Sequence, residues 1–385
     1  MAAPTLYYVD PDDGDDSTGN GLSDATAWKT IQKALDTITR DSTDGDQINI
    51  KAGTDDVLGA VLDVIDYDDA SGVPAPAAPL IFRGYTAVAN DGGIGGIDAG
   101  GATSVWSSTT IDGVHFVDMH LHNSTSSTML TLDNFCMVSN CDIETGGTGH
   151  GIVTGGFGTI HNCYIHDCGG RGVQFSGQNG KVVHCFFRNS TRKFSQAIQI
   201  GTSGGYIAGN VMNLDSTSDG IEFGYGVAVM NNSVYLSSGT GVAINATSAG
   251  GYSNVVVNNL AEINHADADG IMDRTGTGSS FGIYGYNAVY APLGTAYTVA
   301  GGIVDDRGNN VTLTASPFIN AAGGDFRVKP ATAGDGLKGA GWPSAAARKG
   351  LESYPHAIDL GALQRVEAMG QSQTRMSGAN RRTRT

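Results

Sequence analysis

Four stretches of the chain decide its fold: FVDMHLHN at 116–123, VSNCDIET at 138–145, IHNCYIHD at 160–167 and VVHCFFRN at 182–189. Each stretch begins 22 residues after the one before it. Apolar and polar residues alternate within each stretch, which is the pattern of a β-strand with one buried face. A fixed period of this length, built from short strands, is typical of a β-solenoid whose coils stack on one another.

When the four stretches are aligned, each position is mostly apolar or mostly polar in all of them, so the positions form columns. We expect the apolar columns to point inward and the polar columns between them to point outward, because successive side chains of a strand face opposite sides. The inward columns are Phe116/Val138/Ile160/Val182, Met119/Cys141/Cys163/Cys185 and Leu121/Ile143/Ile165/Phe187; the outward ones are His120/Asp142/Tyr164/Phe186 and His122/Glu144/His166/Arg188.

A second marker recurs once per coil: a small residue followed by a β-branched one. The pairs are Gly151-Ile152, Gly172-Val173, Ala197-Ile198, Gly220-Ile221, Gly241-Val242 and Gly270-Ile271. The cysteine column continues as Asn210, Asn232 and Asn259, which we predict to form an inward amide ladder because buried amides need hydrogen-bond partners. The two markers together predict roughly ten to twelve coils stacked at about 4.8 Å.

Composition supports this fold class. Glycine accounts for 57 of 385 residues and charged residues for 16%, which excludes a coiled coil and is unlike a disordered chain. No run of eighteen apolar residues is present, so no membrane-spanning helix is expected. The net charge of −16 speaks against nucleic-acid binding. The opening MAAPTLYYVDPDDGDD does not resemble a secretory signal, so we expect release by lysis, a signal already removed, or no export.

The ends of a solenoid need covers, because a bare last coil exposes unpaired strand edges. Residues 28–39 carry Ile31, Ala34, Leu35 and Ile38 at helical spacing, and we predict an amphipathic capping helix there. The predicted organisation is an N-terminal strand, capping helix and first coil at 1–53, a β-helix with its closing segment at 54–365, and a basic C-terminal arm at 366–385.

The opening TLYYVDPDDGDD…GLSDATAWKTIQKALDTI…GDQINIKAG and the closing SPFINAAGGDFRVKP with HAIDLGALQ resemble right-handed parallel β-helix proteins, the pectate-lyase-like superfamily. The resemblance covers about residues 5–365. It implies an all-β chain that forms a single right-handed parallel β-helix. The superfamily includes pectate lyases, polygalacturonases, phage tailspikes and inert structural proteins, so the resemblance implies no single activity.

The five cysteines are interpreted as thiols, because an odd count in a chain with a large core does not suit a disulfide framework. Cys141, Cys163 and Cys185 are predicted to form a buried stack. Cys136 and Cys168 lie at or near predicted turns and could be reactive. No closely spaced Cys/His quartet of the structural-zinc kind is present.

Residues around the second marker form two columns, expected where each coil begins. Those before the marker are His150, Arg171, Gln196, Asp219, Thr240 and Asp269; those two positions after the small residue are Val153, Gln174, Gln199, Glu222, Ala243 and Met272. By analogy with the superfamily, whose glycan clefts lie along such a face, we predict a polysaccharide site in this strip. The predicted glycan contacts are Gln174, Gln196, Gln199, His150 and Asp273.

Glycoside hydrolysis in this strip would need two carboxylates about 5–9.5 Å apart. Asp219 and Glu222 on one coil, with Asp269 or Asp273 on the next, could supply them. The alternatives are glycan contact without turnover and an ordinary solvated surface. The predicted catalytic residues are Asp219, Glu222, Asp269 and Arg171.

β-Elimination is the other reaction that would suit the strip. A base must remove the proton α to a uronate carboxylate, and Arg171 with Lys193 or Arg192 could serve this chemistry. The acids could then hold Ca²⁺. No other cofactor is expected.

Two further polar features have ordinary interpretations. The outward column His122/Glu144/His166/Arg188 could bind a metal or an acidic sugar, but it also suits a solvated face with cross-strand charge pairs, and we predict no metal site. The acidic loop at 10–16 could bind Ca²⁺; it lacks the EF-hand spacing and is interpreted as a turn.

The C-terminal arm carries a cluster of arginines: Arg375, Arg381, Arg382 and Arg384. It is either a frayed end or an arm that anchors the protein to an acidic partner. We therefore predict a phage-type virion surface protein, a spike or decoration, that is a homotrimer, binds surface polysaccharide and contacts other virion proteins through this arm. The alternatives are an extracellular polysaccharide lyase or glycoside hydrolase, and an inert structural or adhesion rod.

Overall fold

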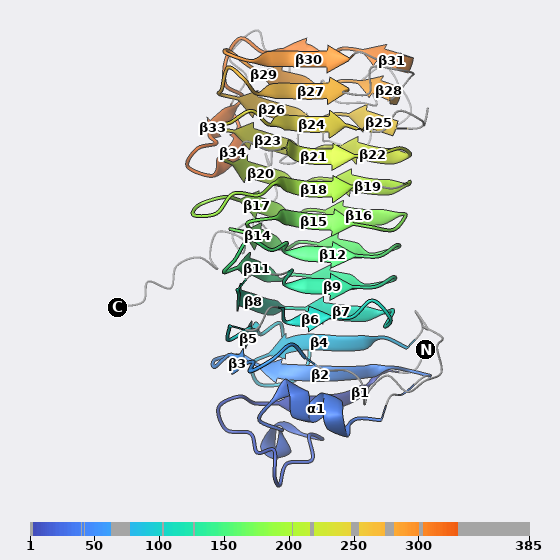
Figure 1. Cartoon of the computed structure of the whole chain (residues 1–385), viewed down its shortest axis with the longest axis vertical. Helices are drawn as coiled ribbons and strands as arrows, with labels where there is room; N and C mark the ends of the chain where they lie inside the picture. Colours follow the sequence, from blue (N-terminus) through green and yellow to red (C-terminus); the bar gives the residue numbers. More distant parts are fainter. Residues whose placement is uncertain are drawn as a thin grey trace, which may run out of the picture.

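The computed structural model describes residues 3–39, 41, 43–62, 78–101, 104–125, 128–201, 203–215, 219–247, 254–273, 281–299 and 303–329. The chain winds into coils that stack along one axis, so that strands from successive coils pair in parallel (Figure 1). These strands form three long sheets, which we call sheets A, B and C. The predicted all-β parallel solenoid is confirmed.

The described residues place 12 strands in sheet A, 11 in sheet B and 9 in sheet C. Sheet A contains β1 (Thr5–Val9), β2 (Asp46–Lys51), β4 (Leu80–Tyr85), β7 (Val114–Val117), β10 (Met137–Ser139), β13 (Thr159–His161), β16 (Gly180–Val183), β19 (Gly205–Ala208), β22 (Val227–Met230), β25 (Asn254–Val257), β28 (Phe281–Gly285) and β31 (Ile303–Gly308). Sheet B contains β3 (Asp56–Val57), β5 (Gly95–Asp98), β8 (Met119–Ser124), β11 (Asp142–Thr145), β14 (Tyr164–His166), β17 (Phe186–Arg188), β20 (Val211–Leu214), β23 (Ser233–Leu236), β26 (Leu260–Ile263), β29 (Ala288–Tyr290) and β32 (Val311–Thr312). Sheet C contains β6 (Trp106–Ser107), β9 (Leu130–Leu132), β12 (Ile152–Thr154), β15 (Arg171–Phe175), β18 (Gln196–Ile200), β21 (Asp219–Phe223), β24 (Val242–Ala246), β27 (Asp269–Asp273) and β30 (Thr295–Val299).

The strand register confirms the columns predicted from the 22-residue period. Val138 pairs with Phe116 and Ile160, and all three side chains are buried in the core. Cys141, Cys163 and Cys185 follow the turns from sheet A to sheet B and are buried in one inward row. Each turn is formed by a residue in the left-handed region, such as Asn140 at φ 56° and Asn162 at φ 53°. Asparagine tolerates this conformation better than most residues.

The inward asparagine ladder is confirmed and is longer than predicted. The Nδ2 of Asn210 donates to Asn232 Oδ1, and that of Asn232 donates to Asn259 Oδ1, each at 3.0 Å. The same pattern continues through Asn287 to Asn310. Each accepting Oδ1 also receives a backbone N–H, as Asn259 Oδ1 does from Asn232. The ladder therefore satisfies a row of amides inside an otherwise apolar core.

The N-terminal end is covered as predicted, by a shorter helix than expected. The helix α1 (Ile31–Thr37) begins after Thr30, whose side chain accepts the N–H of Lys33. It buries Ile31, Ala34 and Leu35 beneath β1 and β2 (Figure 1). The other helical segment among the described residues is the short 3-10 helix η1 (Asp24–Thr26), and no helix there is long and apolar enough to cross a membrane.

The closing segment folds back over the outside of sheet B. Two antiparallel strands, β33 (Phe318–Asn320) and β34 (Asp325–Val328), lie on strands of much earlier coils (Figure 1). Phe318 and Phe326 are buried in a second apolar cluster, which also contains Val211, Tyr235, Leu260, Ala288, Leu313 and Ala321. Asn213 Nδ2 donates to Ala321 O at 3.2 Å. The predicted HAIDLGALQ segment and the arm at 366–385 lie outside the described residues.

Candidate functional site

The predicted strip runs across sheet C over successive strands. Arg171, Gln196 and Asp219 occupy equivalent positions at the start of β15, β18 and β21. Gln174, Gln199 and Glu222 form the neighbouring row on the same strands. The structure therefore brings together most of the side chains that the two markers predicted.

Arg171 is the charged centre of the strip. Its Nε donates to Gln196 Oε1 at 3.0 Å, and Nη1 donates to Gln174 Oε1 at 2.8 Å. Its backbone N–H donates to His150 Nδ1 at 2.7 Å. Burial and the nearby Arg171 charge lower the pKa of His150, which leaves a neutral ring beside the guanidinium. The remaining N–H groups of Arg171 can bind a ligand, since a guanidinium carries five donors in a planar fork.

The second polar pair lies on the next strands. Gln199 Nε2 donates to Glu222 Oε1 at 2.7 Å. These bonds fix the two side chains across adjacent coils but use only part of their hydrogen-bonding capacity. The two rows thus present amide, guanidinium and carboxylate groups at the strand spacing of about 4.8 Å.

The register at β24 corrects the sequence prediction. Ile244, not Val242, pairs with Ile221 and Ile271, so the marker on this coil is Ala243-Ile244. The outward row accordingly contains Asn245 in place of Ala243, and Val242 in place of Thr240. The prediction was wrong because two small residues, Gly241 and Ala243, each precede a β-branched residue.

Asp219 accepts hydrogen bonds from the strand β24. Its Oδ2 accepts Asn245 Nδ2 at 2.5 Å, and its Oδ1 accepts the Val242 N–H at 2.9 Å. Only 6% of Asp219 is exposed, so both oxygens are buried and bonded. Glu222, which is half-buried, remains more accessible than Asp219.

Asp269 does not lie on the coil next to Asp219, contrary to the sequence prediction. Strand β24 separates β21 from β27, so the two aspartates are about 9.6 Å apart in strand spacing, twice the single step. Asp273 shares the register of Ala246, a buried position, rather than that of Asn245. The side chain of Asp273 and the arginines of the arm, Arg375, Arg381, Arg382 and Arg384, lie outside the described residues.

An aromatic pair at the end of sheet C was not predicted. Phe135 and Phe157 follow β9 and β12, are 37% and 52% exposed, and stack with ring centroids 5.1 Å apart and planes 11° from parallel. Both have positive φ, 55° and 57°. The next three coils place Asn179, Gly204 and Gly226 in this turn position, also at positive φ. Phenylalanine is a poor residue for this conformation, and the sequence signal was the aromatic residue at a turn position.

The outer face of sheet B carries histidines and carboxylates near the N-terminal coils. His166 Nε2 lies 3.0 Å from Asp142 Oδ1, and its Nδ1 lies 3.1 Å from Asp167 Oδ2 and 3.6 Å from Glu144 Oε2. Burial lowers the pKa of His166, but the hydrogen bond to Asp142 and the other two carboxylates outweigh burial and raise it above that of a free imidazole. This part of the predicted polar column is a network of cross-strand charge pairs.

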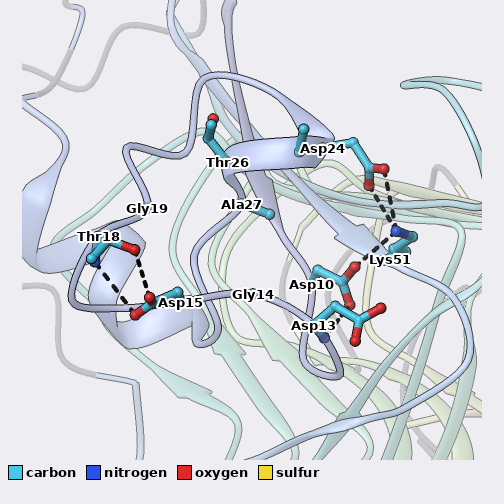
Figure 2. A pocket seen from close by; sticks show the side chains of 11 residues that line it. Asp10, Asp13, Gly14, Asp15, Thr18, Gly19, Asp24, Thr26, Ala27 and Lys51 are labelled. Atoms are coloured by element: carbon cyan, nitrogen blue, oxygen red, sulfur yellow. Dashed lines mark hydrogen bonds and ion pairs between the residues drawn. The ribbon is translucent and has the colours of Figure 1, made fainter.

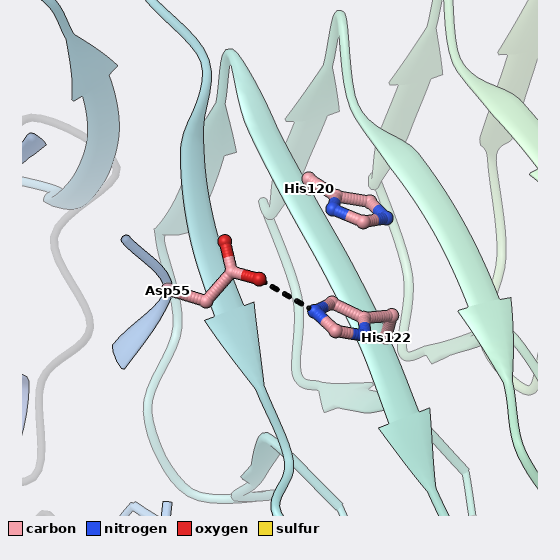
Figure 3. A group of neighbouring side chains, drawn as sticks. All are labelled: Asp55, His120 and His122. Atoms are coloured by element: carbon pink, nitrogen blue, oxygen red, sulfur yellow. Dashed lines mark hydrogen bonds and ion pairs between the residues drawn. The ribbon is translucent and has the colours of Figure 1, made fainter. Parts of the chain in front are cut away.

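A tighter group lies two coils before His166. The rings of His120 and His122, both on β8, stack with centroids 4.5 Å apart. His122 Nε2 lies 3.0 Å from Asp55 Oδ2 (Figure 3). One donor atom from each of Asp55, His120 and His122 lies within 4.8 Å of the others. The prediction of no metal site did not foresee Asp55, which the fold brings from 65 residues before His120.

No protein-family model matches the sequence, and no curated protein matches it. Among solved structures, the pectate lyase Pel9A is similar with a TM-score of 0.51 and 15% identity, over 95% of this chain and 97% of that one. The chain has the fold of that structure, a right-handed parallel β-helix.

Two other solved structures match less well. The GH136 lacto-N-biosidase from Eubacterium ramulus has a TM-score of 0.41 and 13% identity, over 80% of this chain and 68% of that one. A PL6-family polysaccharide lyase from Pseudopedobacter saltans has a TM-score of 0.38 and 12% identity, over 78% and 95%. At 15% identity, the similarity to Pel9A shows the fold alone.

The acidic loop of the β-helix is built into the N-terminal cover. Asp10 accepts the N–H groups of Asp12 and Asp13, and Asp15 accepts those of Ser17 and Thr18. The ammonium of Lys51 lies 2.8 Å from Asp10 Oδ2 and 3.0 Å from Asp24 Oδ1 (Figure 2). Lys51 therefore neutralises Asp10, and hydrogen bonds within the loop hold Asp15, which supports the interpretation as a turn.

All five thiols of the β-helix are free and buried. Burial raises the pKa of Cys136 to about 11 and that of Cys168 to about 12. It also raises the pKa of Cys141 and Cys185, with Cys163 as their common neighbour. The expectation that Cys136 and Cys168 could be reactive is therefore wrong, because their turns point these side chains into the core.

Proposed function

We propose that the protein binds an extended polysaccharide along the outer face of sheet C, on the Phe135/Phe157 pair and the polar rows around Arg171. The carrying observation is the exposed Phe135/Phe157 stack in a conformation that disfavours phenylalanine. Strained backbone conformations cluster at active sites and ligand-binding sites. Neither ring fills the core, so the stack serves something outside the chain.

A sugar ring suits such a stack. One face of many pyranoses presents several C–H groups, and the negative face of an aromatic ring attracts their positive hydrogens. The two rings lie on adjacent coils, so they extend along the solenoid axis as an oligosaccharide would.

The polar rows would supply orientation and selectivity. Arg171 can bind a carboxylate of an acidic sugar through a two-pronged ion pair, while Gln174, Gln196 and Gln199 can bind hydroxyl groups. The net charge of −16 repels an acidic ligand. The positive charge of Arg171 offsets this repulsion within the strip. We infer a ligand with at least some uronate or other acidic residues.

As a setting for this binding, we propose a virion surface, with the protein as a trimeric spike or decoration anchored through the basic C-terminal arm. A measured mass of about three times 39.6 kDa would support the trimer. Loss of particle incorporation on deletion of 366–385 would support the anchor, and normal incorporation would refute it.

Catalysis is the second candidate, favoured by the similarity of the whole fold to a pectate lyase. The residues for it are Glu222, Asp219, Asp269 and Arg171, with Arg192 or Lys193 nearby. Against it, Asp219 is buried with both oxygens bonded, and Asp269 lies two strands away. New reducing ends, or ultraviolet absorbance of an unsaturated uronate, that disappear in Glu222→Gln would support an enzyme.

Binding is tested by titrating a panel of acidic and neutral polysaccharides. We expect the double variant Phe135→Ala/Phe157→Ala to bind at least tenfold more weakly, about 1.4 kcal/mol, and Arg171→Gln to lose acidic ligands selectively. Tyr206→Ala is the matched control, because Tyr206 is 38% exposed on sheet A. Unchanged affinity in the double variant would refute the proposed site.

A further inference from the structure

We propose that Asp55, His120 and His122 form a binding site for a divalent transition-metal ion, with Zn²⁺ as the ion that best suits its donors. The site lies on sheet B, on the coils of β5 and β8, and is separate from the polysaccharide proposal for sheet C. It uses three side chains from two segments that the fold brings together.

The backbone fixes two of the three ligands. His120 and His122 are two residues apart on β8, so both face outward, and their rings are 9° from parallel. Asp55 precedes β3 and reaches across the paired strand β5 to His122 (Figure 3). Tetrahedral donors at about 2.0–2.2 Å from one Zn²⁺ lie about 3.3–3.6 Å apart, so the three donor atoms, all within 4.8 Å of one another, would move closer together when the ion binds.

Gly96 provides an independent observation. It lies on β5, paired with His120, and a Cβ at this position would stand 1.6 Å from Asp55 Oδ1. Its φ is not in the left-handed region, so the backbone does not require glycine. The space is instead occupied by the Asp55 carboxylate, and glycine inside a strand commonly marks such a close approach.

The surroundings favour a metal ion rather than a simple ion pair. Asp142 is the register partner of His120, and Asp98 is that of His122, so further negative charge faces the site. Imidazole donors select Zn²⁺, Ni²⁺ or Cu²⁺ over Ca²⁺ and Mg²⁺.

The site is accessible. The side chain of His122 is 19% exposed and that of Asp55 is 34% exposed. Three protein ligands leave at least one coordination position for water or for an oxygen of another molecule. We therefore infer an open metal site on the surface of the β-helix rather than a closed structural one.

The first experiment titrates chelator-treated full-length protein with Zn²⁺ by calorimetry, and with Co²⁺ by visible absorbance. We expect one high-affinity site per chain, lost in His122→Gln and in Asp55→Asn. His184→Asn is the matched control: His184 is an exposed histidine at φ 57°, where asparagine fits. Equal Zn²⁺ affinity in His122→Gln and the parent would overturn the proposal.

The second variant is Gly96→Ala, which retains all three ligands. Its methyl group displaces the Asp55 carboxylate, so we expect Zn²⁺ affinity to fall by about 10–100-fold, as for a disturbed ligand shell. Circular dichroism in chelator checks that each variant is folded. Unchanged affinity in folded Gly96→Ala would show that Asp55 is not a ligand, and Phe135→Ala/Phe157→Ala should bind Zn²⁺ normally.

Discussion

At the scale of single residues, a phenylalanine at a turn position distinguishes what the fold requires of that position from what function requires of it. The turn after sheet C requires a positive φ on successive coils. Asn179, Gly204 and Gly226 adopt this conformation at little cost in free energy. Phe135 and Phe157 adopt it at a cost of about 1–3 kcal/mol each. Their stack recovers only part, about 0.5–1.5 kcal/mol.

Substitution of Phe157 should therefore separate stability from binding. Phe157→Asn relieves the strained conformation, and we expect it to be about 1 kcal/mol more stable than Phe157→Ala, as measured by urea unfolding. Both variants should lose polysaccharide affinity equally. If the alanine variant proved as stable as the asparagine variant, the turn would not be strained.

The buried thiols give a second prediction. Because all five thiols are buried, and burial also raises the pKa of Cys136, Cys168, Cys141 and Cys185, a thiol reagent at neutral pH should modify none of the five cysteines in the folded protein. All five should react in denaturant. Mass spectrometry of the alkylated protein checks this, and rapid labelling of Cys136 without unfolding would contradict it.

His166 makes stability depend on pH. Its pKa is raised in the folded protein, so its contribution is complete below the imidazole pKa of the unfolded chain, about 6.5, and is lost as the pH rises through the folded value. The difference in melting temperature between the parent and His166→Gln should be larger at acidic than at alkaline pH. His184→Gln, whose pKa is lowered by burial, should show no such increase at acidic pH.

Some site residues could be found from the sequence and others could not. Periodicity places Arg171, Gln174 and Gln199 on one face, because a strand repeats every two residues and a coil about every 22. Periodicity could not identify Asp55 as a site residue, because it lies outside the regular coils, in a connection whose course depends on tertiary packing. The same holds for Asp219, whose burial depends on Asn245 from the following coil.

At the scale of elements, the columns of the solenoid are the units that the sequence predicts well. The cysteine and asparagine rows follow from spacing alone and are confirmed as one continuous inward row. The prediction fails where two local patterns compete, as at β24, because pairing with β21 and β27 selects the register. The length of α1 also differs, since Trp28 pairs with Val9 in a β-bridge instead of beginning the helix.

The asparagine ladder should be sensitive to a single break. Asn232→Ala leaves the backbone N–H of Asn210 without its acceptor, and it removes one hydrogen bond each from Asn210 Nδ2 and Asn259 Oδ1. We expect a loss of about 3 kcal/mol or more, because each unsatisfied buried group costs about 1–3 kcal/mol. Asn264→Ala, at a half-buried position, should change the unfolding free energy by less than about 1 kcal/mol. Equal effects of the two variants would contradict this.

At the scale of the whole molecule, the outer face of sheet B has two parts: one is polar, and the other is apolar and covered by the closing hairpin. Near the N-terminal coils its outer face carries histidines and carboxylates; farther along it carries apolar residues, which β33 and β34 cover. The outward columns predict a polar face only up to Arg188. The later outward residues, such as Val211 and Leu260, are apolar because a distant segment returns to cover them.

Removal of one hairpin anchor should loosen this cover without unwinding the coils. Phe318→Ala removes a fully buried ring and costs about 3–5 kcal/mol of packing. We expect protease cleavage near the hairpin and new binding of a hydrophobic dye, while the β-sheet circular dichroism remains. Ile319→Ala, at a 43% exposed neighbour, should show neither change.

The direction of the hairpin has a mechanical consequence. Phe318 pairs with Val328, and Lys329 N–H donates to Pro317 O, so both open ends of the hairpin lie at the same side. A pull applied through Lys329 therefore opens its hydrogen bonds one after another instead of shearing them together. At low force, the chain would lengthen by up to about 3.5 Å for each residue released from the hairpin. The coils of the β-helix would bear tension only after the released residues are fully extended.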